Sequence, residues 1–316
     1  MRQPTAGIHH ITAFVQDAQG TVDFYSGILG LRLVKKTINF DAPEVYHLYF
    51  GNEIGKPGTI ITFFPWAGSR KGRIGGGQVG ITTYVVPPNS LDFWKQRLES
   101  FNVKVTEVER FQETYLQFQD TEGLRLEIVE RESGENSNWS FGNVTTDKAI
   151  KGFGGAVLYS KAPEKTAETL ESVMGLKRIG EEGSFVRYQA TGDIGNIIDI
   201  DRSVTYDGIG GAGTVHHIAW RAQTDEEHTL WRTHVENSGY HPTKIIDRQY
   251  FHAIYFREHG EILFEIATDP PGFANDEAAE NLGEKLMLPA WFEKYRHEIQ
   301  SNLPDIEVRT LEEDVE

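Results

Sequence analysis

The chain repeats one pattern four times, and this repetition constrains the fold more than any other feature of its 316 residues. Each repeat opens with a glycine and a short run rich in β-forming residues. These glycines are Gly7, Gly77, Gly154 and Gly213, so the repeats start 70, 77 and 59 residues apart. An amphipathic stretch with apolar residues at three- and four-residue steps follows each run, which predicts a helix.

Further β-rich runs complete each repeat. The runs LRLVKKT and LKRIGEE each follow a glycine, and LQFQDTEGLRLEIVE parallels IYFREHGEILFEIATD. Each unit therefore reads β-α-β-β-β, which predicts an α+β fold. Four such units suggest two domains, at 7–131 and 152–268, with a linker at 132–151. Residues 269–316 are expected to form a tail with at least one helix, near 289–300.

Composition excludes several classes of function. Against 31 Lys and Arg stand 47 Asp and Glu, and the net charge of −16 disfavours binding to nucleic acid or to an anionic membrane surface. The chain has no cysteine, which removes disulfides, thiolate metal sites and cysteine nucleophiles. Its first residues lack the apolar core of a secretory signal, and no apolar run reaches the ~18 residues of a membrane span. We therefore expect a cytoplasmic protein.

One helix cannot cover the sheet of a β-α-β-β-β unit, so each unit needs a partner. Two units side by side would curl their sheets into a cup. In this pattern the chain resembles the vicinal-oxygen-chelate superfamily, which includes glyoxalases and extradiol dioxygenases, over almost its whole length. The resemblance implies two glyoxalase-like domains built from four modules.

A cupped sheet brings together inward side chains of the first and last strand of each unit. Aligning the four first strands on their glycines places at one position His10, Ile81, Val157 and His217. Aligning the last strands places at another Phe63, Glu127, Ile200 and Glu265, with Ile200 fixed only to within one residue.

Pairing the units decides where a metal can bind. In chain order, each pair supplies two ligands, His10 with Glu127 and His217 with Glu265. Pairing the first unit with the last supplies three, and the middle pair keeps Glu127 alone. The sequence therefore predicts one metal site, made of His10, His217 and Glu265 from modules 1 and 4, beside a second position that has lost its ligands.

Two imidazoles and one carboxylate form the facial triad of non-heme Fe(II) oxygenases, which leaves positions open for substrate and O₂. Glu265 lies in the apolar run LFEIA, where an unpaired carboxylate is costly and a metal would compensate it. Strand alternation allows only one histidine of each His-His pair to face the cup, so we expect His9 and His216 to be neighbours of the ligands.

The chain resembles most closely the hydroquinone-type ring-cleaving dioxygenases, especially the 2-methylhydroquinone-associated group, in GIHHITAFVQDAQGTVDFY, TVHHIAWRA, DRQYFHAIYFREHGEILFEIATDPPGF and LGEKLMLPAWFEKYRHEI. The resemblance implies Fe(II) bound by His10, His217 and Glu265. It also implies a role in aromatic catabolism or quinone detoxification, with a small hydroquinone-like substrate and O₂. The positions that would line the site around them are His9, Thr12, His216, Arg248 and Tyr255.

Arg248 and Tyr255 are separated by seven residues, which would place them on opposite faces of one strand. Both can line one pocket only if a bulge or turn intervenes near 250–252. The remaining histidines His228, His234, His241 and His297 have no partners at ligand spacing, and we expect them to be exposed.

Two other classes of function stay open at this stage. A glyoxalase-like isomerase or thiol transferase would use four protein ligands, whereas the fourth position here is read as Phe63. A metal-free binding protein would not need three well-placed ligands. The sequence leaves open Mn(II) as the native metal, the ring substituents of the substrate, the cleavage position and a homo-oligomer.

Overall fold

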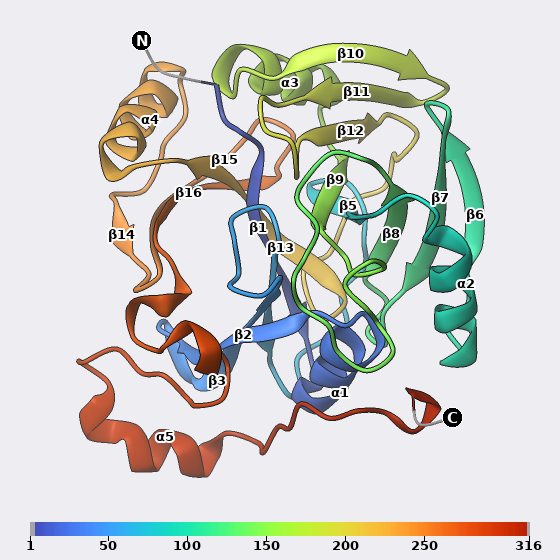
Figure 1. Ribbon diagram of the computed structural model, residues 1–316. Helices are drawn as coiled ribbons and strands as arrows, with labels where there is room; N and C mark the ends of the chain where they lie inside the picture. The colour runs from blue at the N-terminus through green and yellow to red at the C-terminus, as the bar shows by residue number, and fades with distance from the viewer. Residues whose placement is uncertain (1–3, 315–316) are drawn as a thin grey trace.

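The computed structural model describes residues 4–314, which form two curled sheets of eight strands each (Figure 1). The sixteen strands fall into four β-α-β-β-β units, so the predicted α+β class and the four modules are confirmed. Within each unit the helix follows the first strand, as the amphipathic stretches predict.

The first two modules occupy the N-terminal half of the chain. Module 1 comprises β1 (Ile8–Val15), α1 (Ala18–Val22) continued by a π-helical turn (Asp23–Ile28), β2 (Arg32–Asn39), β3 (Ala42–Gly51) and β4 (Ile60–Pro65). Module 2 comprises β5 (Gln78–Val86), α2 (Leu91–Ser100), β6 (Thr106–Arg110), β7 (Glu113–Gln119) and β8 (Arg125–Glu130).

The other two modules repeat the order. Module 3 comprises β9 (Gly152–Tyr159), α3 (Pro163–Glu168) continued by a π-helical turn (Thr169–Val173), β10 (Lys177–Glu182), β11 (Phe185–Gln189) and β12 (Ile197–Asp201). Module 4 comprises β13 (Thr214–Ala222), α4 (Asp225–Asn237), β14 (Ile246–Asp247), β15 (Phe251–Arg257) and β16 (Leu263–Pro271).

Modules pair across the two halves of the sequence. One sheet has the order β14-β15-β16-β13-β1-β4-β3-β2 and joins modules 4 and 1. The other has the order β10-β11-β12-β9-β5-β8-β7-β6 and joins modules 3 and 2. In both sheets the first strands meet antiparallel at the centre, and each first strand runs parallel to the last strand of its own module. This pairing confirms that modules 1 and 4 share one sheet.

The largest apolar cluster joins side chains of both sheets and of the module helices. The helix of module 1 packs against module 2: Phe24 lies 6.4 Å from Phe118 between ring centroids, and the Tyr25 hydroxyl donates to Asp120 Oδ2 at 2.9 Å. Apolar side chains therefore hold the two sheets and the module helices together.

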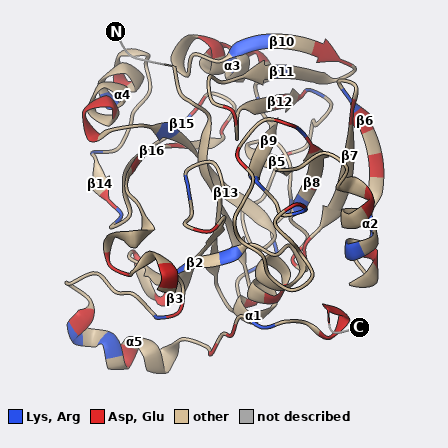
Figure 2. Cartoon of the chain, in the orientation of Figure 1, with Lys and Arg blue, Asp and Glu red and all other residues tan. Residues whose placement is uncertain are grey.

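The C-terminal tail wraps module 1 and carries short helices, including α5 (Arg296–Asn302), near the predicted position. Lys35 on β2 is fully buried and donates to the carboxylates of Asp276 and Glu277, both at 2.8 Å. Acidic and basic residues are interspersed on outer elements such as α2 and α5 (Figure 2). No helix among the described residues is long and apolar enough to cross a membrane.

Candidate metal centre

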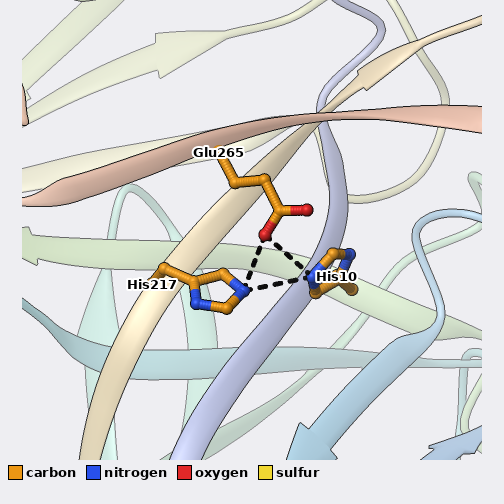
Figure 3. Close-up of side chains that lie close together, drawn as sticks. All are labelled: His10, His217 and Glu265. Atoms are coloured by element: carbon orange, nitrogen blue, oxygen red, sulfur yellow. Dashed lines mark hydrogen bonds and ion pairs between the residues drawn. The ribbon is translucent and has the colours of Figure 1, made fainter. Parts of the chain in front are cut away.

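Three side chains from three neighbouring strands converge at the centre of the first sheet (Figure 3). His217 Nε2 lies 2.8 Å from Glu265 Oε2, His10 Nε2 lies 3.4 Å from the same oxygen, and the two imidazole nitrogens are 3.2 Å apart. At most 5% of each side chain is exposed. The structure thus brings together the three residues predicted as ligands, and within residues 4–314 they form the single cluster of metal-ligating side chains.

The contacts to Glu265 lack the direction of hydrogen bonds, and the spacing of the three ligand atoms suits a metal. Neither oxygen of Glu265 receives a well-directed hydrogen bond from the described residues, although the carboxylate is fully buried. Burial favours the neutral acid, but the imidazoles of His10 and His217 hold the pKa of Glu265 well below its ordinary value. Ligand atoms around an ion with bonds of about 2.1 Å at right angles lie about 3.0 Å apart. The donor set and its spacing therefore suit a divalent transition metal.

Two β-bulges bring His9 and His216, the other histidine of each His-His pair, to the site. The β1–β13 ladder pairs Ile8 with Trp220 and then His10 with Ala219, so His9 is an extra residue. The same ladder skips His216 between Val215 and His217. A bulge re-aims a side chain that strict alternation would turn away. The His9 and His10 Nδ1 atoms are 2.9 Å apart, and those of His216 and His217 are 2.8 Å apart.

His9 and His216, the two histidines at the bulges, differ in what lies next to their Nε2 atoms. A ligand imidazole that uses Nε2 carries its proton on Nδ1 and donates it to a neighbour. His9 and His216 then accept at Nδ1 and hold their own proton on Nε2. His9 donates that proton to the carbonyl of Thr268 at 3.0 Å, whereas His216 lines the open pocket.

Both histidines at the bulges stay neutral. Burial lowers the pKa of His9 well below the ordinary value, and the neighbouring His10 lowers it further. His216 is exposed to the pocket, but partial loss of hydration and the neighbouring His217 still lower its pKa below the ordinary value. Near neutral pH these imidazoles therefore act through the fixed positions of their protons and not as cations.

The strand ladders correct three alignments made from the sequence. The bulges of the second sheet fall at Gly80 and Gly154, so Gly155 occupies the position of His217, where Val157 was expected. At the last-strand position stand Thr62 in module 1 and Asp199 in module 3, where Phe63 and Ile200 were expected. Phe63 instead packs in the apolar core, 4.4 Å from the ring of Tyr25.

In the second sheet the carboxylate equivalent to Glu265 meets an arginine in place of imidazoles. Arg110 donates to both oxygens of Glu127, at 3.1 and 2.9 Å, and to Asp199 at 2.9 Å. Arg187 donates to both oxygens of Asp199, at 2.8 and 2.9 Å. Glu127 thus has a cationic partner in the protein itself, and the second position is an ion-pair cluster with no histidine.

A pocket of about 400 Å³ opens above the triad. Its walls are mainly aromatic and aliphatic, and its polar lining includes His216, Arg248 and Tyr255, but not the fully buried Thr12. The sequence analysis missed two further pocket residues, His47 and Tyr49. A histidine and a tyrosine alternating on a strand that pairs with β4 were the available signal.

Arg248 and Tyr255 meet as the interpretation of the sequence required. A turn with Gln249 at a φ of +71° follows Arg248, and the β15–β16 ladder shifts register between Phe251 and Ala253. The Arg248 Nε donates to the Tyr255 hydroxyl at 3.3 Å. Burial and the nearby Glu265 raise the pKa of Tyr255, so its phenol keeps its proton.

One expectation about the other histidines is wrong. His228 is only 1% exposed, and its Nε2 lies 2.8 Å from the carbonyl of Ile266. It packs the inner face of α4 against β16, a role that the helix periodicity could have indicated. His234 is half-buried, contrary to expectation, whereas His241 and His297 are exposed as expected.

Comparisons with known proteins agree with this geometry. The family described as the Glyoxalase/Bleomycin resistance protein/Dioxygenase superfamily matches residues 7–128 and 152–275. The chain is 62% identical to the "Putative ring-cleaving dioxygenase MhqO" of Bacillus subtilis (strain 168), over 99% of this chain and all of that protein. It is 35% identical to the chlorohydroquinone/hydroquinone 1,2-dioxygenase of Sphingobium indicum, over 95% of this chain and 96% of that protein.

A solved structure shows the same arrangement throughout the chain. The crystal structure of a "putative dioxygenase" from Bacillus subtilis subsp. subtilis str. 168 superposes with a TM-score of 0.97 at 62% identity, covering 98% of this chain and 100% of that one. With both halves matched and the four modules in place, this chain belongs to the Glyoxalase/Bleomycin resistance protein/Dioxygenase superfamily.

Proposed function

We propose that the protein is an Fe(II)-dependent ring-cleaving dioxygenase that acts on hydroquinone-type aromatic diols, in aromatic catabolism or quinone detoxification. The observation that carries the proposal is the convergence of His10, His217 and Glu265 beneath an aromatic-walled pocket. The names of the relatives support ring cleavage, and one of them names hydroquinone. The reaction adds both atoms of O₂ to the diol as one ring carbon–carbon bond breaks.

The chemistry that Fe(II) supplies at a facial triad is electron transfer between a coordinated phenolate and dioxygen. The protein supplies the surroundings. Apolar walls that include Phe14, Phe64 and Phe251 keep water from the ring and strengthen every polar contact inside. Tyr255 pairs with Glu265 across the β15–β16 ladder, which sets its phenol beside the triad.

Polar groups on one side of the pocket would hold the substrate oxygens. Arg248 stays cationic, because the nearby Tyr255 and Asp41 raise its pKa against the effect of burial. It can stabilise negative charge that develops on an oxygen during the reaction. The Nε2 proton of His216 also faces the pocket and can be donated to a substrate oxygen, while Tyr255 donates from its protonated hydroxyl.

This arrangement suits a para-diol held through one oxygen. The hydroxyl nearest the triad would lie beside Tyr255, and the para hydroxyl would need no contact with the metal. We expect the value of kcat/KM for methylhydroquinone to exceed that for 4-methylcatechol, and Arg248→Ala to lower turnover more than iron content. A tenfold preference for the catechol, about 1.4 kcal/mol, would overturn the para-diol assignment and leave ring cleavage standing.

A glyoxalase-like isomerase or thiol transferase fits the site less well. Such sites generally use a fourth protein ligand, and the fourth position here holds Thr62. Its hydroxyl lies 2.8 Å from the Thr12 hydroxyl and 2.8 Å from His47 Nε2. A neutral hydroxyl already engaged by two neighbours is a poor substitute for a carboxylate or imidazole ligand. A metal-free binding protein would leave both oxygens of the buried Glu265 carboxylate without a well-directed hydrogen bond from the described residues.

The direct test is anaerobic reconstitution with Fe(II), followed by measurement of oxygen uptake with hydroquinone, methylhydroquinone and catechol. Reconstitution with Mn(II) in parallel identifies the metal that supports turnover. We expect one iron per chain and oxygen uptake in one-to-one ratio with diol consumed. Absence of uptake with all three diols by the iron-loaded protein would contradict the proposal.

A further inference from the structure

A chain of four polar side chains runs from the pocket wall to the floor of the metal site. The Tyr49 hydroxyl lies 2.8 Å from His47 Nδ1, and His47 Nε2 lies 2.8 Å from the Thr62 hydroxyl. The Thr62 hydroxyl in turn lies 2.8 Å from that of Thr12. His47 lines the pocket beside Phe64, with ring centroids 4.4 Å apart, while both threonines are fully buried.

The far end of this chain meets the open side of the triad. The strand ladders relate modules 1 and 4 by a pseudo-twofold axis, which exchanges His10 with His217 and Thr62 with Glu265. The side of the site opposite Glu265 therefore faces Thr62 and Thr12. Thr12 lies two residues after His10 on the same strand face and opposite His217 in the β1–β13 ladder.

Tyr49 fixes the direction of the hydrogen bonds. A phenol that accepted a hydrogen bond from His47 would still need an acceptor for its own proton, and Tyr49 is only 2% exposed. Among residues 4–314 its hydroxyl has His47 as its one hydrogen-bond partner. Burying an unsatisfied donor disfavours that arrangement by about tenfold or more. Tyr49 therefore donates to His47, His47 to Thr62, and Thr62 to Thr12.

We infer that His47 is a positioning residue: through Thr62 it turns the Thr12 hydroxyl into a hydrogen-bond donor toward a substrate oxygen on the open side of the triad. Because Thr12 accepts from Thr62, its own proton stays free, and it lies beneath the pocket lining on the strand face that carries His10. Hydrogen bonds in such a chain polarise one another, so the terminal donor is stronger than an isolated hydroxyl. This inference rests on the proposed function for the identity of the substrate, although not for the direction of the chain.

The test is a double-mutant cycle between His47 and Thr12 in the iron-loaded protein. Anaerobic calorimetry measures the dissociation constant of methylhydroquinone, or of catechol if the wild-type protein binds that instead. We expect His47→Phe and Thr12→Val each to weaken binding about tenfold, the loss of one hydrogen bond to a charged oxygen. The double variant should bind no more weakly than Thr12→Val, because His47 acts only through Thr12.

Three further variants separate this role from a packing role. His47→Gln keeps one donor and one acceptor, and should restore affinity to within about threefold of wild type. Thr62→Val cuts the chain between its ends, and should match Thr12→Val even if His47→Phe fails to fold. His252→Phe, at a half-buried histidine that is bonded to Asp225 outside the pocket, is the matched control and should leave diol affinity unchanged.

Several results would overturn the inference. The first is diol binding by the double variant that is about 100-fold weaker than that of the wild type. The second is unchanged diol binding by His47→Phe. The third is loss of iron from His47→Phe with diol binding otherwise intact. Failure of the proposed function looks different, because it appears as absent oxygen uptake by wild type. The binding cycle would still report whether His47 and Thr12 are coupled.

Discussion

At the scale of single residues, the two sheets differ in the partners of one buried glutamate: imidazoles in the first sheet and an arginine in the second. Glu265 and Glu127 occupy equivalent last-strand positions in the two sheets, and both are fully buried. Glu265 faces His10 and His217, whereas Glu127 accepts from Arg110. Equivalent carboxylates are therefore placed beside imidazoles that could share a metal in one sheet and within an internal ion pair in the other.

This contrast gives a matched pair of variants. Glu265→Gln should reduce iron to well under one per chain, because it removes the only anionic ligand, and His10→Ala and His217→Ala should do the same. Glu127→Gln, with the same change of shape and charge, should keep one iron per chain. Elemental analysis after anaerobic reconstitution measures both. Two metals in the wild-type chain, or loss of iron in Glu127→Gln, would show that the second sheet also binds metal.

The two bulge histidines should separate metal affinity from substrate affinity. Removing a hydrogen-bond partner of a ligand imidazole typically weakens metal binding about 10- to 100-fold, so His9→Phe and His216→Phe should both do so. Only His216 faces the pocket, so only its replacement should also weaken diol binding when iron is saturating. Chelator competition measures the first effect and anaerobic calorimetry the second. Equal losses of diol affinity in both variants would contradict the different roles.

At the scale of elements, the sequence predicted which helices and strands form, but not the exact register of the strands. The four β-α-β-β-β units and the convergence of His10, His217 and Glu265 follow from periodicity and repeated spacing. The bulges at His9 and His216 do not, because a bulge adds one residue without leaving a compositional mark, and a slip of one residue reverses the faces of a strand. That is why Phe63 was placed where Thr62 stands and Val157 where Gly155 stands. The same limit hid His47, because its partner Thr62 was not placed at the site.

The ion pairs of Glu113, at the start of β7, predict how the stability of the second sheet responds to acid. Glu113 accepts hydrogen bonds from Arg131 at 2.6 Å and from Arg187 at 2.7 Å. Because Arg187 belongs to module 3, its ion pair joins modules 2 and 3. Burial favours the neutral acid, but these ion pairs outweigh it and lower the pKa of Glu113 from 4.5 to about 2. The folded state therefore binds fewer protons than the unfolded state between those values. The stabilisation is complete above pH 4.5 and is lost as the pH falls toward 2.

Glu113→Gln should accordingly lower the free energy of unfolding by about 2–3 kcal/mol at pH 7, and its deficit relative to wild type should shrink by about 1 kcal/mol at pH 4. Urea unfolding at both pH values measures the difference. Glu109→Gln, at an exposed position on the adjacent β6, is the control and should show no such dependence. A deficit that is constant with pH would mean that Glu113 stabilises the sheet by packing alone.

At the scale of the whole molecule, the two sheets interlock the halves of the sequence. The β1–β13 ladder joins modules 1 and 4, and the β5–β9 ladder joins modules 2 and 3. The division of the chain into domains at 7–131 and 152–268 remains a prediction. Each sheet of eight strands takes strands from both ranges. Both ligand histidines and the glutamate can meet only when the two halves are folded against each other.

Cutting the linker tests this interlocking. A protease site inserted between the exposed residues Glu135 and Asn136 should allow cleavage of the folded protein, and the two pieces should stay associated and keep one iron. Residues 1–131 or 152–316 expressed alone should bind no iron tightly, because the first supplies only His10 and the second only His217 and Glu265. Size-exclusion chromatography with elemental analysis distinguishes these states. Tight binding by either half alone would mean that the metal site is complete within one half and that the shared sheet is not required for it.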